Sequence, residues 1–147
     1  MYQGIVINKD DAGYTSKITE IASKTLEEGE VRVEVKYSTL NYKDALAITG
    51  RSPVVRSFPL TPGIDFSGVV IESKHPAWKK GDEALLNGWG VGEKYSGGLA
   101  EQVTVPGDWL IQKPSAFSFK DRQQVIPQCC VLWLCKSMAL NQVMGKF

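Results

Sequence analysis

Two short blocks of the sequence place polar side chains among glycine, proline and apolar residues. The first block, 40–45, contains Asn41 and Tyr42, and the second, 62–68, contains Asp65. Both lie where a predicted strand gives way to a loop, and rigid folds carry binding chemistry on such loops. A polar side chain buried there needs a partner. One block alone is more typical of a turn, because Asn and Asp bond their own backbone. Two blocks so close in the chain favour a functional site.

The overall composition is that of an ordinary globular protein. The 147 residues are 43% hydrophobic and 22% charged, and 17 basic against 16 acidic residues give a net charge of +1. A chain of this length can bury a core as one domain. The balanced charge argues against nucleic acid or an anionic membrane as a partner. No stretch is long enough to span a bilayer, and the N-terminus does not have the pattern of a signal peptide. The composition therefore excludes two classes of partner and names none; a small-molecule substrate is what the resemblance described below implies.

The cysteines are confined to one short segment. Cys129, Cys130 and Cys135 are the only three, and an odd count without partners elsewhere argues against a disulfide framework. It favours a reducing compartment, so we expect a cytoplasmic protein. The single histidine, His75, is distant in sequence, and adjacent cysteines rarely both face one metal ion. Buried apolar thiols are therefore preferred to a metal site.

Period-two alternation and glycine-containing turns predict a mainly β protein with a few short helices. The strongest strand is 31–37, where every second residue is apolar. Further strands are predicted at 4–7, 17–21, 64–72, 81–86, 100–105 and 109–111. Gly68 lies inside one of them and indicates a bulge or a close backbone approach. Only 42–49 and the segment after Ser118 have a helical pattern. Such spacing is typical of an antiparallel barrel or sandwich.

A glycine-dense loop follows the fifth predicted strand. Gly88, Gly90 and Gly92 alternate with other residues around Trp89. The segment lacks the G-x-G-x-x-G spacing of a dinucleotide-binding turn and is not followed by a strand–helix unit. It is either a flexible barrel loop or a loop whose backbone approaches a ligand, with Trp89 as an aromatic wall. The sequence leaves both readings open.

Several segments together resemble the zinc-free quinone-oxidoreductase branch of the medium-chain dehydrogenase/reductase superfamily, and within it the acrylyl-CoA reductase group. The matching segments are 38–47, 58–68, 88–93, 97–101 and 108–110, and the resemblance covers about residues 1 to 126. It implies a GroES-like, partly open β-barrel as the catalytic domain. It also implies NADPH-dependent reduction of an activated C=C bond, in acrylyl-CoA or a similar enoyl thioester, or of a quinone.

The resemblance also bears on metal binding. In zinc-dependent relatives a cysteine stands at the position of Asn41, and a His-Glu pair follows the glycine that matches Gly63. This chain has Ile64 and Asp65 at the latter two positions. A catalytic zinc needs three ligands from nitrogen, sulfur or carboxylate groups, and one Asp without Cys or His does not supply them. We therefore expect no metal.

The first group of candidate catalytic residues comes from the two blocks. Hydride addition to the β-carbon develops negative charge on the carbonyl oxygen, which needs donors, and the α-carbon needs a proton source. The resemblance implies that Tyr42 contacts the nicotinamide end of NADPH and that Asn41 orients cofactor or substrate with its amide. Asp65 is expected to orient the loops rather than donate a proton, because an unperturbed Asp is ionised at neutral pH.

The second group would form the substrate pocket. Trp89 and Gly90 would contribute to its wall. Arg56 would hold an acidic part of substrate or cofactor, although a surface salt bridge is the commoner role for such a residue.

The domain organisation predicted from the resemblance has two parts. Residues 1–120 form the GroES-like catalytic domain, and 121–147 form a helical segment that leads towards a nucleotide-binding domain absent from this sequence. Relatives continue into a Rossmann domain that holds most of the NADPH site, and the parent enzyme is expected to be a homodimer. We therefore expect the 147-residue chain alone to be inactive. Residues 127–135 depart from the small-residue segment of the family, through either a reading-frame disturbance or divergence.

Two non-catalytic alternatives remain open. The chain could be a GroES-like binding module without catalytic activity. It could also be an inactive truncated paralogue that pairs with full-length relatives.

Overall fold

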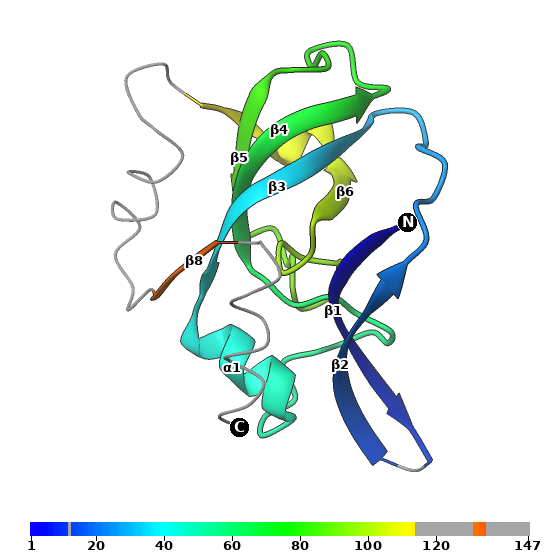
Figure 1. Cartoon of the computed structure of the whole chain (residues 1–147), viewed down its shortest axis with the longest axis vertical. Helices are drawn as coiled ribbons and strands as arrows, with labels where there is room; N and C mark the ends of the chain where they lie inside the picture. The colour runs from blue at the N-terminus through cyan, green and yellow to red at the C-terminus, as the bar shows by residue number, and fades with distance from the viewer. Residues whose placement is uncertain (12, 114–130, 135–147) are drawn as a thin grey trace.

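The computed structural model describes residues 1–11, 13–113 and 131–134 (Figure 1). The elements, in chain order, are β1 (Tyr2–Asp10), β2 (Gly13–Ile21), β3 (Glu30–Leu40), α1 (Tyr42–Thr49), β4 (Asp65–Ser73), β5 (Glu83–Asn87), β6 (Gln102–Pro106), the 3₁₀ helix η1 (Gly107–Trp109), β7 (Ile111–Gln112) and β8 (Val131–Leu134). The predicted mainly β class is confirmed. Within the described ranges, no helix has the length and apolar character needed to cross a membrane.

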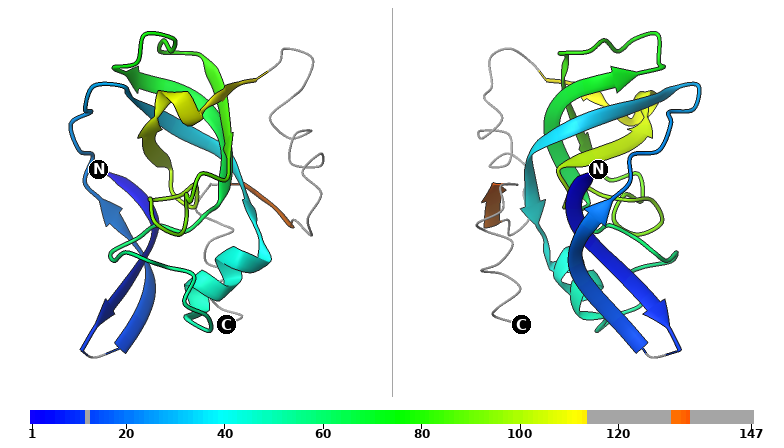
Figure 2. Two further views of the ribbon diagram at one scale, coloured as in Figure 1. Left: turned by 180° about the vertical axis from the view of Figure 1, so that it is seen from behind. Right: turned by 45° about the vertical axis from the view of Figure 1, so that its right-hand side comes forward.

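The strands form two antiparallel sheets. One is the β1–β2 hairpin, and the other has the order β6-β3-β4-β5-β7, with β8 paired to β3. Backbone hydrogen bonds join β1 to the loops that flank the larger sheet, from Ile5 N–H to Leu99 O at 3.0 Å and from Ile7 N–H to Leu60 O at 2.8 Å. Figure 2 shows the hairpin beside the strongly curved larger sheet. The described strands leave both sheets open rather than closing them into a barrel.

The core follows from the predicted alternation. On β3, Val31, Val33 and Val35 are buried and pack with residues of β4, β5 and β6. Burial of one such side chain stabilises the fold by about 1.5–3 kcal/mol. Two smaller clusters place Ala47 and Ile48 of α1 against the hairpin and its flanking loops. The helix is therefore anchored through one apolar face.

Gly68 confirms the predicted close backbone approach. A Cβ atom at this position would overlap the carbonyl oxygen of Glu34 on β3. The β3–β4 register also shifts between Val35 and Tyr37, opposite Gly68 and Ser67. The irregularity thus lies on β3, while the glycine permits the approach from β4.

Two predicted elements differ from the structure. The strand predicted at 109–111 is wrong at its start, because Trp109 ends η1 and only Ile111 of that segment belongs to β7. The helical pattern predicted for 121–147 is wrong for 131–134, which form the strand β8. The rest of that segment, with all three cysteines, lies outside the described residues.

Candidate functional site

The two polar blocks meet at one end of the β3–β4 pair. These strands are antiparallel neighbours, so the end of β3 lies beside the start of β4. Asn41 follows β3 as the N-cap of α1, and Asp65 is the first residue of β4. Sheet pairing alone therefore brings the two side chains together.

Asn41, Asp65 and Thr39 form one buried polar network. The Asn41 amide donates to Asp65 Oδ2 at 3.1 Å and to Thr39 Oγ1 at 2.8 Å. The Thr39 hydroxyl and backbone N–H both donate to Asp65 Oδ1, at 2.6 and 2.9 Å. Asn41 is 8% exposed and Asp65 3%. Both are therefore placed to hold the scaffold rather than to touch a ligand.

A second buried carboxylate, Asp44, joins the two blocks through the backbone. Its Oδ2 accepts the Asn41 N–H at 2.9 Å, and its Oδ1 accepts the Gly63 N–H at 3.0 Å. Asp44 occupies the third position of α1, from which a carboxylate can reach back to the N-cap. Burial raises the pKa of Asp44 to about 6, the backbone N–H of Asn41 opposes this shift, and the charge of Asp65 adds to it. Two buried carboxylates, Asp44 and Asp65, thus lie close enough for the charge of one to affect the pKa of the other.

The turn that carries Gly63 cannot accept a side chain. Its φ of 109° lies in a region that favours glycine. A Cβ atom there would lie 2.5 Å from Leu99 N and 2.6 Å from Gly98 N. The Gly98 N–H in turn donates to Gly63 O at 3.0 Å. Close backbone packing therefore fixes the entry into β4 beside Asp65.

Tyr42 lies next to this network but faces solvent. It is the first residue of α1 and is 77% exposed. Its ring is the part of the predicted catalytic group that an incoming molecule can reach. The structure thus brings Asn41 and Asp65 together and leaves Tyr42 beside them as an accessible aromatic surface.

The predicted pocket residues belong to a different cluster. The exposed Arg56 donates its backbone N–H to Glu93 O at 2.8 Å, and Gly90 O accepts the Lys94 N–H at 2.9 Å. Trp89, 59% exposed, stacks on Trp109 with ring centroids 5.8 Å apart.

One ion pair connects this cluster to the helix that begins at the polar network. Lys43, the second residue of α1, pairs with the side chain of Glu93. The loop that carries Trp89 and Gly90 is therefore linked to the site through α1, and these two residues are not part of the polar network itself.

Sequence reasoning missed Thr39, Asp44 and the position-specific role of Gly63. Asp44 carried a signal, since an Asn N-cap followed three residues later by an acid is typical of a helix start. Thr39 carried none, because a threonine near the end of a strand is ordinary.

Metal ligands are not gathered at this site. Within 1–11, 13–113 and 131–134, no group of three or more His, Cys, Asp or Glu residues is close enough to hold an ion. The oxygens of Asp65 instead accept hydrogen bonds from Thr39 and Asn41.

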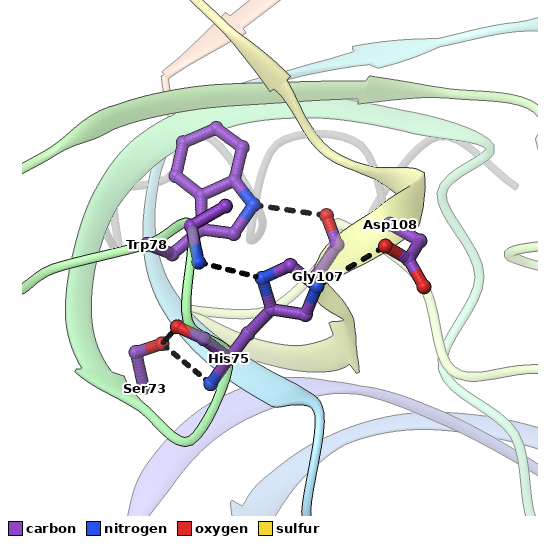
Figure 3. A network of polar contacts seen from close by, with 6 residues as sticks. Ser73, His75, Trp78, Gly107 and Asp108 are labelled. Carbon is purple, nitrogen blue, oxygen red and sulfur yellow. Dashed lines mark hydrogen bonds and ion pairs between the residues drawn. The ribbon is translucent and has the colours of Figure 1, made fainter.

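The only histidine of the chain serves a turn elsewhere (Figure 3). His75 Nδ1 accepts the Ala77 N–H at 3.2 Å, and Nε2 lies 3.1 Å from Asp108 Oδ1. Nearby, the Trp78 indole N–H donates to Gly107 O at 2.9 Å. These contacts fasten the β4–β5 turn to η1, so His75 has a structural role.

Residues 27–115 match the family model of the alcohol dehydrogenase GroES-like domain. The chain is 48% identical over 112 residues to the probable acrylyl-CoA reductase AcuI of Escherichia coli (strain K12), covering 76% of this chain and 35% of that protein. It is 35% identical over 121 residues to the putative quinone oxidoreductase YhfP of Bacillus subtilis (strain 168), covering 82% of this chain and 37% of that protein.

Among solved structures, the chain is similar to the yhdH oxidoreductase of Salmonella enterica in complex with NADP. The TM-score is 0.75 and the identity 44%, over 82% of this chain and 37% of that one. The chain thus spans little more than a third of the length of each of these relatives.

Proposed function

Because the chain belongs to the alcohol dehydrogenase GroES-like domain family, we propose that it is the catalytic-domain portion of a zinc-free, NADPH-dependent oxidoreductase. Its substrate would be an activated C=C bond, as in acrylyl-CoA or a similar enoyl thioester, or a quinone. The similarity to an acrylyl-CoA reductase and to a quinone oxidoreductase supports both substrate classes. The complete enzyme is proposed to be a cytoplasmic homodimer.

The observation that carries the proposal is the buried Asn41–Asp65 contact beside the exposed Tyr42. An amide and a carboxylate joined by a hydrogen bond form a rigid polar scaffold that has no need of a metal ion. A flat aromatic surface at the edge of that scaffold suits a planar ring. In this proposal Tyr42 touches the nicotinamide, while Asn41 and Asp65 are positioning residues that hold the start of α1.

The described residues fit only one end of the cofactor. Tyr42 offers a ring, and the glycine-dense loop lacks a helix start that could bind phosphates. When bound, NADPH would supply the hydride equivalent for the reduction. The part of Tyr42 is to orient the nicotinamide face and exclude water from it.

The division into a catalytic domain at 1–120 and a connecting segment at 121–147 is part of the same proposal. The relatives are almost three times as long as the matched region, and near-attack geometry needs both walls of a cleft. We therefore expect the 147-residue chain to contact NADPH weakly and not to turn over. Consumption of NADPH in the presence of acrylyl-CoA by this chain would contradict that expectation.

Saturation-transfer NMR of NADPH with the 147-residue chain tests the proposal directly. The nicotinamide protons should receive more saturation than the adenine protons, and Tyr42→Ala should remove the nicotinamide signal. The matched control is Ile111→Ala, which removes another exposed apolar side chain, on β7 and outside the polar network. Equal transfer to both rings, or a signal unchanged in Tyr42→Ala, would favour the non-catalytic binding module instead.

A further inference from the structure

A cavity of about 610 Å³ opens between the β1–β2 hairpin and the edge of the larger sheet. Small-molecule sites typically have about 300–1,000 Å³. Its lining includes Tyr2, Lys24, Lys94, Tyr95 and Trp109, and it includes none of the proposed catalytic residues. The cavity is therefore distinct from the site proposed for NADPH.

The cavity exists because the two sheets separate. Glu101 N–H, just before β6, donates to Gln3 O of β1 at 2.8 Å. Tyr2, next to Gln3 on β1, pairs with Ile21 of β2 within the hairpin. β6 pairs with β3 along one edge only. Among the described strands, nothing covers the remaining edge of β6. The gap is thus built by the backbone and does not depend on one side-chain rotamer.

The charged groups of the lining are predominantly positive. They are Lys24, Lys94 and Glu30. Glu30 is already engaged, since it accepts from Lys24 Nζ at 2.7 Å and from the Glu27 N–H at 2.8 Å. Lys94 has no carboxylate partner among the described residues, and its Nζ lies 5.3 Å from the centroid of the Tyr95 ring. One cation is consequently available to an incoming anion.

The aromatic groups form a fixed surface. Tyr95 meets Trp109 edge-on, with ring centroids 5.0 Å apart and an angle of 63° between the ring planes. Trp89 stacks on the same Trp109 ring. At the opposite wall, Tyr2 is partly buried. Burial raises the pKa of Tyr2, and the nearby charges of Arg32 and Lys24 act in the opposite direction. Tyr2 thus adds an aromatic group from the hairpin to those that Tyr95 and Trp109 supply.

From this combination we propose that the cavity binds a small aromatic anion. The anionic group meets Lys94, and the ring packs on Tyr95 and Trp109. Cation and aromatic surface reinforce one another, because the lysine neutralises charge while the rings supply apolar area. The inference goes beyond the proposed reductase activity and does not depend on it.

The test is a titration of the 147-residue chain with 2-naphthoate, followed by ¹⁵N–¹H NMR and by tryptophan fluorescence. Saturable shifts are expected at Lys94, Tyr95 and the Trp109 indole. Lys94→Glu should weaken binding roughly threefold to tenfold, as expected for removal and reversal of one exposed charge. Lys94→Gln, which tests charge loss alone, should have the smaller effect of the two. The matched control is Lys79→Glu, an exposed lysine on the β4–β5 turn, which should leave binding unchanged.

Three outcomes would overturn the proposal. They are equal affinity for the neutral 2-naphthalenemethanol, an effect of Lys79→Glu as large as that of Lys94→Glu, and shifts that do not saturate or that spread over the fold. The Tyr42→Ala variant separates this inference from the proposed function. Its loss of contact with NADPH should leave 2-naphthoate binding intact, so either proposal can fail without the other.

Discussion

The backbone N–H of Gly63 donates to the side-chain carboxylate of Asp44 across 3.0 Å, and this bond joins the turn before β4 to the first turn of α1. The same carboxylate holds the N–H of Asn41. One fully buried side chain therefore sets the relative position of the two segments that form the candidate site.

Replacement of Asp44 should destabilise the fold. Asp44→Ala leaves two buried N–H groups without an acceptor, and each such group costs about 1–3 kcal/mol. Asp44→Asn keeps the shape but turns one acceptor into a donor. Only one of the two N–H groups then loses its acceptor, so the cost should be that of a single such group. Urea unfolding at pH 7.5 measures both. Asp82→Asn is the control, since that carboxylate accepts one N–H, from Lys79, in an exposed turn and its loss should cost less.

The stability contributed by Asp44 should fall as pH rises. Its pKa is raised from 3.8 to about 6, with burial as the largest cause. Between these values the folded state holds more protons than the unfolded state, so the slope of the unfolding free energy with pH is negative. The pH-dependent part of this contribution, about 3 kcal/mol, is complete below pH 3.8 and is lost as pH rises through about 6. The hydrogen bonds to the Asn41 and Gly63 N–H groups account for the part that remains at pH 7.5.

The difference in unfolding free energy between the wild type and Asp44→Asn, measured from pH 4 to pH 7, isolates this effect from other groups. Glu30, whose pKa is lowered, acts with the opposite sign and is common to both proteins. A difference that is flat, or that grows with pH, would show that Asp44 does not titrate in this range.

Neutralisation of Asp65 should lower the pKa of Asp44. The charge of Asp65 is one of the causes that raise it, so Asp65→Asn removes repulsion from the second carboxylate. Carboxyl ¹³C titration by NMR follows Asp44 directly. Asp65→Asn should also destabilise the fold by about 1–3 kcal/mol, because the carboxylate that accepts from three donors of Thr39 and Asn41 is removed. An unchanged titration of Asp44 would contradict the coupling of the two groups.

Gly63→Ala should be more costly than Gly81→Ala. Both glycines have positive φ, at 109° and 97°, so both substitutions strain the backbone. Only at Gly63 does the added Cβ meet backbone atoms, whereas nothing lies within 4 Å of it at Gly81. We expect Gly81→Ala to cost about 1 kcal/mol and Gly63→Ala about 2 kcal/mol more, in thermal or urea unfolding. Equal costs would mean that strain alone decides.

The sequence predicted those elements whose pattern is local. The strand 31–37 and the helix 42–49 are observed within β3 and as α1, because alternation and helical spacing are properties of neighbouring residues. At 109–111 three consecutive apolar residues fit a strand as well as the end of a 3₁₀ helix. In the structure Trp109 ends η1 and Ile111 begins β7, a division that the local pattern does not specify.

The site was predictable in part for the same reason. Asn41 and Asp65 stand out as polar residues at strand ends, and strand pairing brings them together. Arg56, Trp89 and Gly90 lie on loops, whose course depends on contacts such as Lys43–Glu93 and Trp89–Trp109 that no local pattern encodes.

Gly68 has a consequence for the site that lies further along the same strands. From the close approach of Gly68 to Glu34, β3 and β4 continue past the register shift between Val35 and Tyr37 to Thr39 and Asp65. Any side chain at position 68 would wedge these strands apart at a point only three residues from Asp65. The lack of a side chain at Gly68 thus allows β3 and β4 to lie close together. This strand separation in turn sets the distance between the Thr39 and Asp65 sides of the polar network.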